Sequence, residues 1–192
     1  MNRVSVVKII GSIGLVISML LSGCTTSITD NNGSGNDLTA TEVIRLMGNG
    51  INLGNTLEAY NHKSYVDSGV NPTSFETLWG QPVTTRDMID DMKALGFDTL
   101  RIPVAWTNGI NYESGDYTID ERLMNRVDEV VNYALDADMY VILNDHWDGS
   151  WWGMFGSGDE AVREKGMALY KSIWTQLCEH FSDYSYLSLI HI

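Results

Sequence analysis

The residues best suited to chemistry in this sequence follow an apolar run near residue 140. The run from Tyr140 to Leu143 ends in Asn144 and leads into a polar, titratable and aromatic stretch: Asp145, His146, Trp147, Asp148, Gly149, Ser150, Trp151 and Trp152. Strands that are covered on both faces have continuous apolar runs, and parallel α/β folds bind ligands just beyond the carboxyl ends of their strands. The sequence therefore predicts a site directly after this strand.

The aromatic side chains of this stretch indicate what such a site could bind. Trp147, Trp151 and Trp152 fall within six residues of one loop, and Trp106 lies in another loop. Sugar rings present apolar C–H faces rimmed by hydroxyl groups, which suits indole faces placed among hydrogen-bonding groups. Tryptophan also packs often in cores and interfaces, so a structural role for each ring stays open. The cluster as a whole favours carbohydrate binding.

A metal centre is an alternative use of the same stretch. Asp145, His146 and Asp148 carry side chains that bind zinc or hard cations. However, only one histidine is present locally, and His62 and His180 have no evident ligand partner in the sequence. We therefore expect no metal and no cofactor, and metal analysis of the folded protein would decide between the two hypotheses.

The elements that would position these residues alternate between strands and helices from Leu38 onward. Strands are expected at residues 50–53, 97–104 and 139–143, and helices at residues 40–47, 85–95, about 118–135 and 159–181. Thr39 with Glu42, and Thr118 with Glu121, have the spacing of capping boxes. Leu95 is expected on the apolar face of its helix, and a long polar loop is expected from Glu58 to Pro82.

This alternation predicts an α/β fold built from parallel βα units. The candidate architecture is a TIM (β/α)8 barrel, which needs eight strands, whereas the sequence supplies about three βα units and a segment near Ser185 where a fourth strand would begin. We therefore expect residues 38–192 to be the amino-terminal part of a barrel, truncated after about three βα units. A doubly wound sheet is the alternative, but no strand is followed by a Gly-rich phosphate-binding turn.

The amino terminus predicts export. Arg3 and Lys8 precede an apolar run from Ile9 to Leu21 that contains no acidic residue. Such a run is too short for a membrane-spanning helix and is typical of a secretory signal peptide, here residues 1–23. The segment Leu21-Ser22-Gly23-Cys24 resembles the lipobox of bacterial lipoproteins, in which the cysteine is lipidated.

The predicted address of the protein follows from this resemblance. Residues 24–37 are rich in Thr, Ser, Asn and Gly and read as a flexible tether. Lipid attachment at Cys24 would hold the following domain to a membrane, on the cell surface or the periplasmic face. An ordinary signal peptide with a chance cysteine remains the alternative.

Charge and cysteine content limit the partners. The sequence has 12 Lys and Arg against 25 Asp and Glu, a formal net charge of −13. This acidity argues against nucleic acid and anionic lipid as partners and suits a neutral polymer. Cys178 is the only cysteine after Cys24, so no disulfide is expected within the domain, and its apolar neighbours predict a buried thiol.

Three blocks of the sequence together resemble glycoside hydrolase family five, the cellulase-like retaining β-glycanases. The blocks are Gly50-Ile51-Asn52-Leu53-Gly54-Asn55-Thr56-Leu57, Gly96-Phe97-Asp98-Thr99-Leu100-Arg101-Ile102-Pro103-Val104-Ala105-Trp106 and the stretch 140–152. The resemblance extends over residues 47–184 in the right order and spacing. It implies a TIM barrel that hydrolyses β-linked glucan or hemicellulose in polysaccharide catabolism, as an endo-β-1,4-glucanase does. No obligate protein partner is evident in the sequence.

The resemblance also implies roles for individual residues. Arg101 matches the arginine that orients the nucleophilic carboxylate, and His146 matches the histidine that contacts the sugar beside the cleaved bond. The weaker candidates for substrate binding are Asn52, Asn55, Trp106, Trp147, Trp151 and Trp152. Many relatives carry a second histidine where this chain has Trp147, so the subfamily and the preferred glycan stay open.

The two catalytic glutamates of the family have no counterpart in this sequence. Retaining hydrolysis needs two carboxyl groups about 5 to 5.5 Å apart, and in the family one of them lies in an Asn-Glu-Pro segment that does not occur here. We therefore expect this chain alone to be inactive. The competing hypothesis is a non-catalytic, cell-surface glycan-binding lipoprotein, for which the missing glutamates would not matter.

Overall fold

The computed structural model describes residues 39–69, 71–184 and 188–191. The predicted signal peptide (1–23), the predicted tether (24–37) and the predicted lipidation site Cys24 lie outside these residues. None of the helices in the described ranges is both long and apolar enough to cross a membrane.

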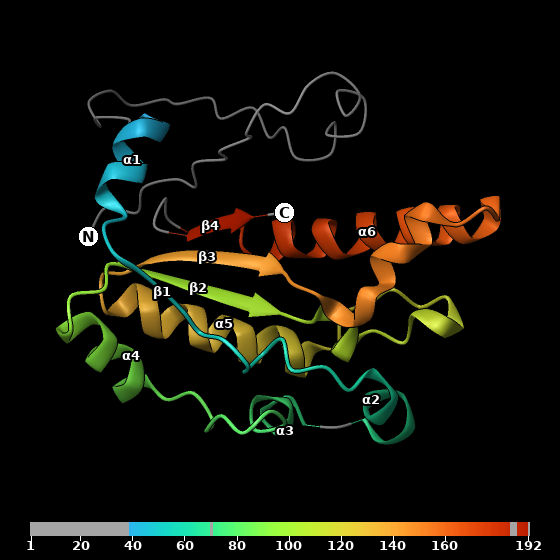
Figure 1. Cartoon of the computed structure of the whole chain (residues 1–192), viewed down its shortest axis with the longest axis horizontal. Coiled ribbons are helices and arrows are strands. Elements are labelled where there is room, and N and C mark those ends of the chain that lie inside the picture. Colours follow the sequence, from blue (N-terminus) through green and yellow to red (C-terminus); the bar gives the residue numbers. More distant parts are fainter. Residues whose placement is uncertain (1–38, 70, 185–187, 192) are drawn as a thin grey trace.

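A parallel four-stranded sheet forms the centre of the fold (Figure 1). Its strands are β1 (Gly50–Asn52), β2 (Thr99–Val104), β3 (Tyr140–Asp145) and β4 (Ser188–His191), in the spatial order β1-β2-β3-β4. Each strand pairs in parallel with the next strand along the chain. Parallel neighbours joined through helical crossovers are βα units, which confirms the predicted α/β class. The carboxyl ends of all strands therefore lie at one edge of the sheet.

Six α-helices and three 3₁₀ segments connect and cover the described strands. The α-helices are α1 (Ala40–Leu46), α2 (His62–Ser68), α3 (Thr73–Glu76), α4 (Arg86–Ala94), α5 (Glu121–Asp136) and α6 (Glu160–His180). The 3₁₀ segments are η1 (Trp106–Gly109), η2 (Tyr112–Ser114) and η3 (Asp148–Gly156). The capping box predicted for α1 is confirmed, because the side chains and backbone N–H groups of Thr39 and Glu42 satisfy each other.

One face of the sheet carries the hydrophobic core. Fully buried residues of this face are Leu100, Ile102, Val104, Val141 and Leu143. They join one apolar cluster with Val127, Val130, Val131 and Ala134 of α5 and Leu169, Ile173 and Leu177 of α6. Side chains alternate between the faces of a strand, so Arg101 and its register partners Asn52 and Ile142 lie on the opposite face.

Several local predictions were wrong. The expected loop from Glu58 to Pro82 contains the helices α2 and α3. The side chain of Asp120, rather than that of Thr118, caps α5 by accepting a hydrogen bond from the Arg122 N–H. Leu95 is 78% exposed because α4 ends at Ala94 and Leu95 is its C-cap. Cys178 is only half-buried on α6.

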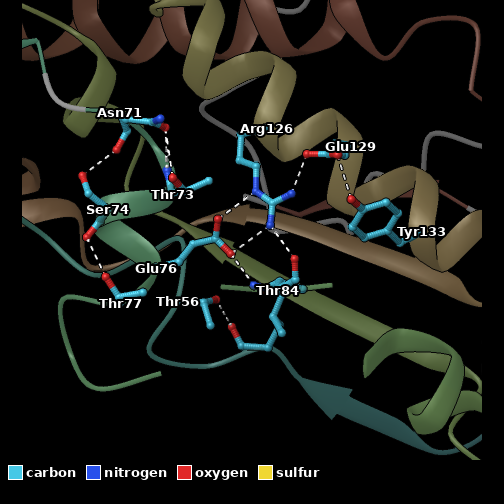
Figure 2. A network of polar contacts seen from close by, with 11 residues as sticks. Thr56, Asn71, Thr73, Ser74, Glu76, Thr77, Thr84, Arg126, Glu129 and Tyr133 are labelled. Atoms are coloured by element: carbon cyan, nitrogen blue, oxygen red, sulfur yellow. Dashed lines mark hydrogen bonds and ion pairs between the residues drawn. The ribbon is translucent and has the colours of Figure 1, made fainter. Parts of the chain in front are cut away.

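A buried ion pair ties the connection between β1 and α4 to α5 (Figure 2). The Arg126 guanidinium donates from Nε and Nη2 to the two carboxylate oxygens of Glu76, at 2.7 and 3.1 Å. Nη2 also donates to the carbonyl of Thr84, whose N–H donates to the Glu76 carboxylate. The side chain of Glu76 is 0% exposed and that of Arg126 is 8% exposed. Burial alone would lower the pKa of Arg126, but its hydrogen bonds with Glu76 and Glu129 outweigh burial and raise it.

Pro103 lies inside β2, where its nitrogen can donate no hydrogen bond. The N–H of Leu53 donates to the carbonyl of Arg101 at 2.9 Å, so residues 101 and 103, two apart in the strand, direct their backbone polar groups toward β1. Pairing of β1 with β2 ends at Asn52 and Arg101. Pro103 therefore faces no strand on that side, and its missing N–H costs no ladder hydrogen bond.

Candidate active site at the carboxyl ends of the strands

Three polar side chains from consecutive strands meet at the carboxyl edge of the sheet. Nη1 of Arg101 donates to Oδ1 of Asn52 at 2.6 Å, and Nη2 lies 3.3 Å from Nδ1 of His146. Asn52 ends β1, Arg101 lies in β2, and His146 directly follows β3. We call Asn52, Arg101 and His146 the strand-end cluster. The parallel register of the strands brings these residues together across about 50 positions of sequence.

The contact with Arg101 selects one tautomer of the His146 ring. A guanidinium group has only donors, so Nδ1 of His146 must accept and the ring proton must lie on Nε2. The backbone N–H of His146 donates to the carbonyl of Val104 at 3.0 Å, which continues the pairing of β3 with β2 by one residue. His146 is exposed, and its Nε2–H is therefore available to donate to a ligand hydroxyl.

The positive charge of Arg101 has no acidic partner within the described residues, where its hydrogen bonds go to an amide oxygen and an imidazole nitrogen. The side chain is half-buried. A half-buried guanidinium with neutral partners favours an anionic group nearby and holds a carboxylate in its ionised form. The geometry therefore suits a residue that orients a carboxylate.

The predicted aromatic residues lie at different depths. Trp147 is 52% exposed. Its ring packs edge-to-face with the ring of Tyr60, with the two ring centroids 5.4 Å apart. Trp152 is half-buried, and its Nε1–H donates to the carbonyl of His146 at 3.4 Å. Trp151 stacks on Trp152 and is 5% exposed, and Trp106 is 0% exposed. Contact of a sugar with Trp106 or Trp151 would require these rings to be uncovered first.

Asn55 makes its backbone hydrogen bond to a residue outside the strand-end cluster. It adopts a left-handed backbone conformation with φ of 62° in the turn after β1. Its N–H and that of Thr56 donate to the buried carboxylate of Glu58, at 2.5 and 2.9 Å. Glu58 was not predicted, and it fixes the turn that carries Asn55 beside the edge of the sheet.

Asp145 and Asp148 form a buried acidic pair behind the cluster. Asp145 is three residues beyond Ile142, so its side chain lies on the opposite face of β3 from Arg101. No hydrogen bond of good geometry reaches its carboxylate within the described residues, although Asp148 and Trp151 lie close enough to affect its titration. Burial raises the pKa of Asp145, and the charge of Asp148 raises it further. Burial also raises the pKa of Asp148, and hydrogen bonds from Thr107 oppose that shift.

The placement of this pair bears on the metal hypothesis. Within the described ranges no group of three or more His, Cys, Asp or Glu side chains is arranged to hold a metal ion. Asp145 and His146 lie on opposite faces of the strand end, because consecutive side chains alternate.

The tight turn after β3 gives a first test of this geometry. Gly149 has φ of 69°, and a Cβ at this position would lie 2.2 Å from Cζ of Tyr60. We expect Gly149→Ala to lower the free energy of unfolding by about 1 to 3 kcal/mol, since it combines backbone strain with a clash. Gly153→Ala is the matched control because no atom lies within 4 Å of its Cβ position. Equal urea midpoints for the two variants would contradict the close contact with Tyr60.

Parallel strands that carry polar and aromatic residues at their carboxyl ends are typical of α/β barrel enzymes. Sequence comparison identifies which of these enzymes the chain resembles. Residues 63–190 match the model of the family "Cellulase (glycosyl hydrolase family 5)", and the chain belongs to this family. The predicted family and the predicted α/β barrel class are both confirmed, since the related structures are TIM barrels.

The relatives are endoglucanases. Endoglucanase B of Clostridium cellulovorans is 40% identical over 148 residues, which cover 77% of this chain and 30% of the relative. Endoglucanase A of Clostridium longisporum is 43% identical over 146 residues, 76% of this chain and 26% of the relative. This chain thus spans less than a third of the length of these two enzymes.

Solved structures show the same relationship. A GH5-4 broad specificity endoglucanase from Ruminococcus champanellensis, solved with bound cellotriose, has a TM-score of 0.70 and 40% identity, covering 80% of this chain and 42% of that one. A family 5 glycoside hydrolase from Prevotella bryantii, solved as a mutant with a xyloglucan tetradecasaccharide, has a TM-score of 0.69 and 34% identity, covering 80% and 43%.

Proposed function

We propose that this chain contributes the Arg101 and His146 side of the active site of a retaining endo-β-1,4-glucanase. The observation that carries the proposal is the strand-end cluster, in which a half-buried guanidinium with neutral partners can orient a carboxylate. The Nε2–H of His146 and the exposed face of Trp147 can bind a sugar ring beside it. Relatives solved with cellotriose and xyloglucan support a β-glucan or hemicellulose as the ligand.

In this proposal the strand-end cluster binds and orients, and two carboxyl groups outside the cluster carry out the chemical step. Retaining hydrolysis uses one carboxylate as nucleophile and a second as acid and then base. The strand-end cluster contains neither. We therefore expect the chain alone to bind cello-oligosaccharides without cleaving them, and to act in catalysis only together with the two glutamates of a complete barrel.

Calorimetric titration of the full chain with cellotriose, together with an assay of reducing sugar released from carboxymethylcellulose, tests this proposal. Heat of binding without release of sugar is the expected result. Sugar release abolished by Arg101→Lys would show that the chain supplies its own carboxylates, and absence of binding would reject the proposed site. If a complete barrel that contains this chain also binds cellotriose but releases no reducing sugar, that result would favour the glycan-binding lipoprotein instead.

Trp147 gives the proposal its most direct variant. We expect Trp147→Ala to weaken cellotriose binding about tenfold, because removing an exposed aromatic anchor commonly costs more than 1 kcal/mol. Trp79→Ala is the control, since Trp79 is also exposed, at 45%, but lies in the connection between α3 and α4. If both variants bind like the original chain, Trp147 is not part of the glycan site.

We also propose that the protein is a lipoprotein held to a membrane through Cys24, on the cell surface or the periplasmic face. The support is the order of residues at the amino terminus: basic residues come first, an apolar run follows, and the small residues of Leu21-Ser22-Gly23-Cys24 come last. Labelling of expressing bacteria with a radioactive fatty acid tests it. Incorporation that disappears in Cys24→Ala is expected, whereas labelling that persists in this variant would reject the assignment.

A further inference from the structure

The turn after β3 has an unusual backbone conformation. Asp148, Gly149 and Ser150 have φ values of 44°, 69° and 64°, so three consecutive residues are left-handed and two of them are not glycine. Left-handed conformations are unfavourable for residues with a Cβ, and they persist where surrounding contacts enforce them. The turn therefore needs an anchor.

The carboxylate of Asp148 supplies this anchor. Asp148 is 0% exposed, and its two oxygens lie 3.1 and 3.0 Å from the backbone nitrogen of Thr107, which donates to them. The Thr107 hydroxyl donates to Oδ1 at 2.5 Å. Thr107 belongs to η1, which follows β2, so these bonds join the ends of two neighbouring strands across 41 residues. Hydrogen bonds to an ionised acceptor are shorter and stronger than neutral ones.

The anchored turn also fixes the two residues that precede it. Trp147 lies directly before Asp148 and meets the Tyr60 ring edge-on. The same Tyr60 ring leaves no room for a Cβ at Gly149, so the turn is held from the side of Tyr60 as well as from Thr107. His146, one residue earlier, has its backbone N–H bonded to Val104 and its ring bonded to Arg101. A shift at Asp148 would therefore move Trp147 first.

We propose that Asp148 is a positioning residue that, through Thr107, holds Trp147 and His146 in the orientation needed to bind a glycan. The side chain of Asp148 is completely buried, so its role in this proposal is to hold other residues in place. The inference rests on the proposed glycan-binding function of Trp147 and His146. It extends that function to a pair of residues, Asp148 and Thr107, whose contribution is the geometry of the turn.

The experiment compares four variants of the full chain. Asp148→Asn removes the charge and keeps the shape, Thr107→Val removes only the hydroxyl donor, and Thr107→Ser restores that donor. Asp159→Asn is the matched control, because Asp159 is an exposed cap of α6 whose capping role asparagine can fill. The first readout needs no ligand: the NMR resonance of the Trp147 indole N–H, assigned by its loss in Trp147→Phe. The second is the dissociation constant of cellotriose.

We expect both Asp148→Asn and Thr107→Val to shift or broaden the Trp147 indole resonance. Asp148→Asn should weaken cellotriose binding at least tenfold, and Thr107→Val should weaken it about threefold. Thr107→Ser and Asp159→Asn should match the original chain in both readouts. A folded Asp148→Asn variant with an unchanged Trp147 resonance overturns the inference. If Asp148→Asn does not fold, Thr107→Val decides in the same way. If the original chain binds no cellotriose, the proposed function fails, while the indole resonance still decides whether Asp148 positions Trp147.

Discussion

Glu76→Gln is expected to lower the free energy of unfolding by about 3 to 5 kcal/mol, the usual cost of removing one partner of a buried ion pair. The Arg126 charge would stay in place with a buried side chain, and its remaining acidic partner would be Glu129, which is 51% exposed. Thr84 would also lose its charged acceptor. Urea unfolding followed by circular dichroism measures the effect, and the unfolding transition should keep its slope.

A second set of variants distinguishes whether Glu76→Gln lowers the free energy of unfolding by leaving a charge unpaired or by disturbing packing. We expect the double variant Glu76→Leu with Arg126→Met to recover most of the stability, since apolar residues of similar volume commonly replace a buried ion pair at little cost. Asp67→Asn removes one partner of the exposed pair with Lys63 and should change stability by less than about 1 kcal/mol. A Glu76→Gln variant as stable as Asp67→Asn would show that the ion pair does not anchor the connection to α5.

Asp145→Asn is expected to stabilise the protein at pH 8 by about 2 kcal/mol, an unusual direction for a substitution at a buried position. Burial and the neighbouring Asp148 raise the pKa of Asp145 far above its ordinary value of about 4, so the folded protein holds a proton that the unfolded chain releases. The stability contributed by this group is therefore fully present below pH 4 and is lost as the pH rises toward the folded-state pKa. Asparagine has nearly the same shape and needs no proton.

Thermal unfolding at pH 5 and pH 8 tests this prediction. The melting temperature of Asp145→Asn should exceed that of the original chain by about 4 to 8 °C at pH 8, given about 2 to 4 °C per kcal/mol for a domain of this size. The difference should shrink toward pH 5. The groups that face Asp145 are Asp148 and Trp151, with Thr107 bonded to Asp148, so Asp138→Asn at an exposed position is a suitable control. A difference that is equal at both pH values would mean that Asp145 is ionised in the fold.

The predictable parts of the fold are those with a strong local pattern. The strand containing Val141 begins with a continuous apolar run, the strand containing Leu100 is mostly apolar, and α5 and α6 have apolar residues at helical spacing over many turns. The helices α2 and α3 were missed because they are only 7 and 4 residues long and each buries few residues. Their position depends on the contact between Glu76 and Arg126, which are 50 residues apart in sequence.

The same distinction applies to the candidate site. Arg101 and His146 were predicted from their match to the family motifs, and parallel pairing of β2 with β3 explains why these two side chains lie close together. Tyr60 and Thr107 could not be predicted, because their importance comes from contacts with Trp147 and Asp148 on another connection. An Asp-Gly pair shortly after a strand indicates a tight turn, which was the one local signal for the conformation of Asp148. The burial of Trp106 and Trp151 likewise depends on tertiary packing that tryptophan content does not reveal.

The proline in β2 also restricts how the first two strands can be aligned. Sliding β1 by two residues toward the carboxyl end of β2 would keep every side chain on its present face, so burial alone does not exclude that alignment. In the slipped alignment the carbonyl of Ile51 would face the nitrogen of Pro103, which has no proton to donate, so this carbonyl would lose its partner in the ladder. Pro103 thus selects against the competing register and keeps Asn52 level with Arg101.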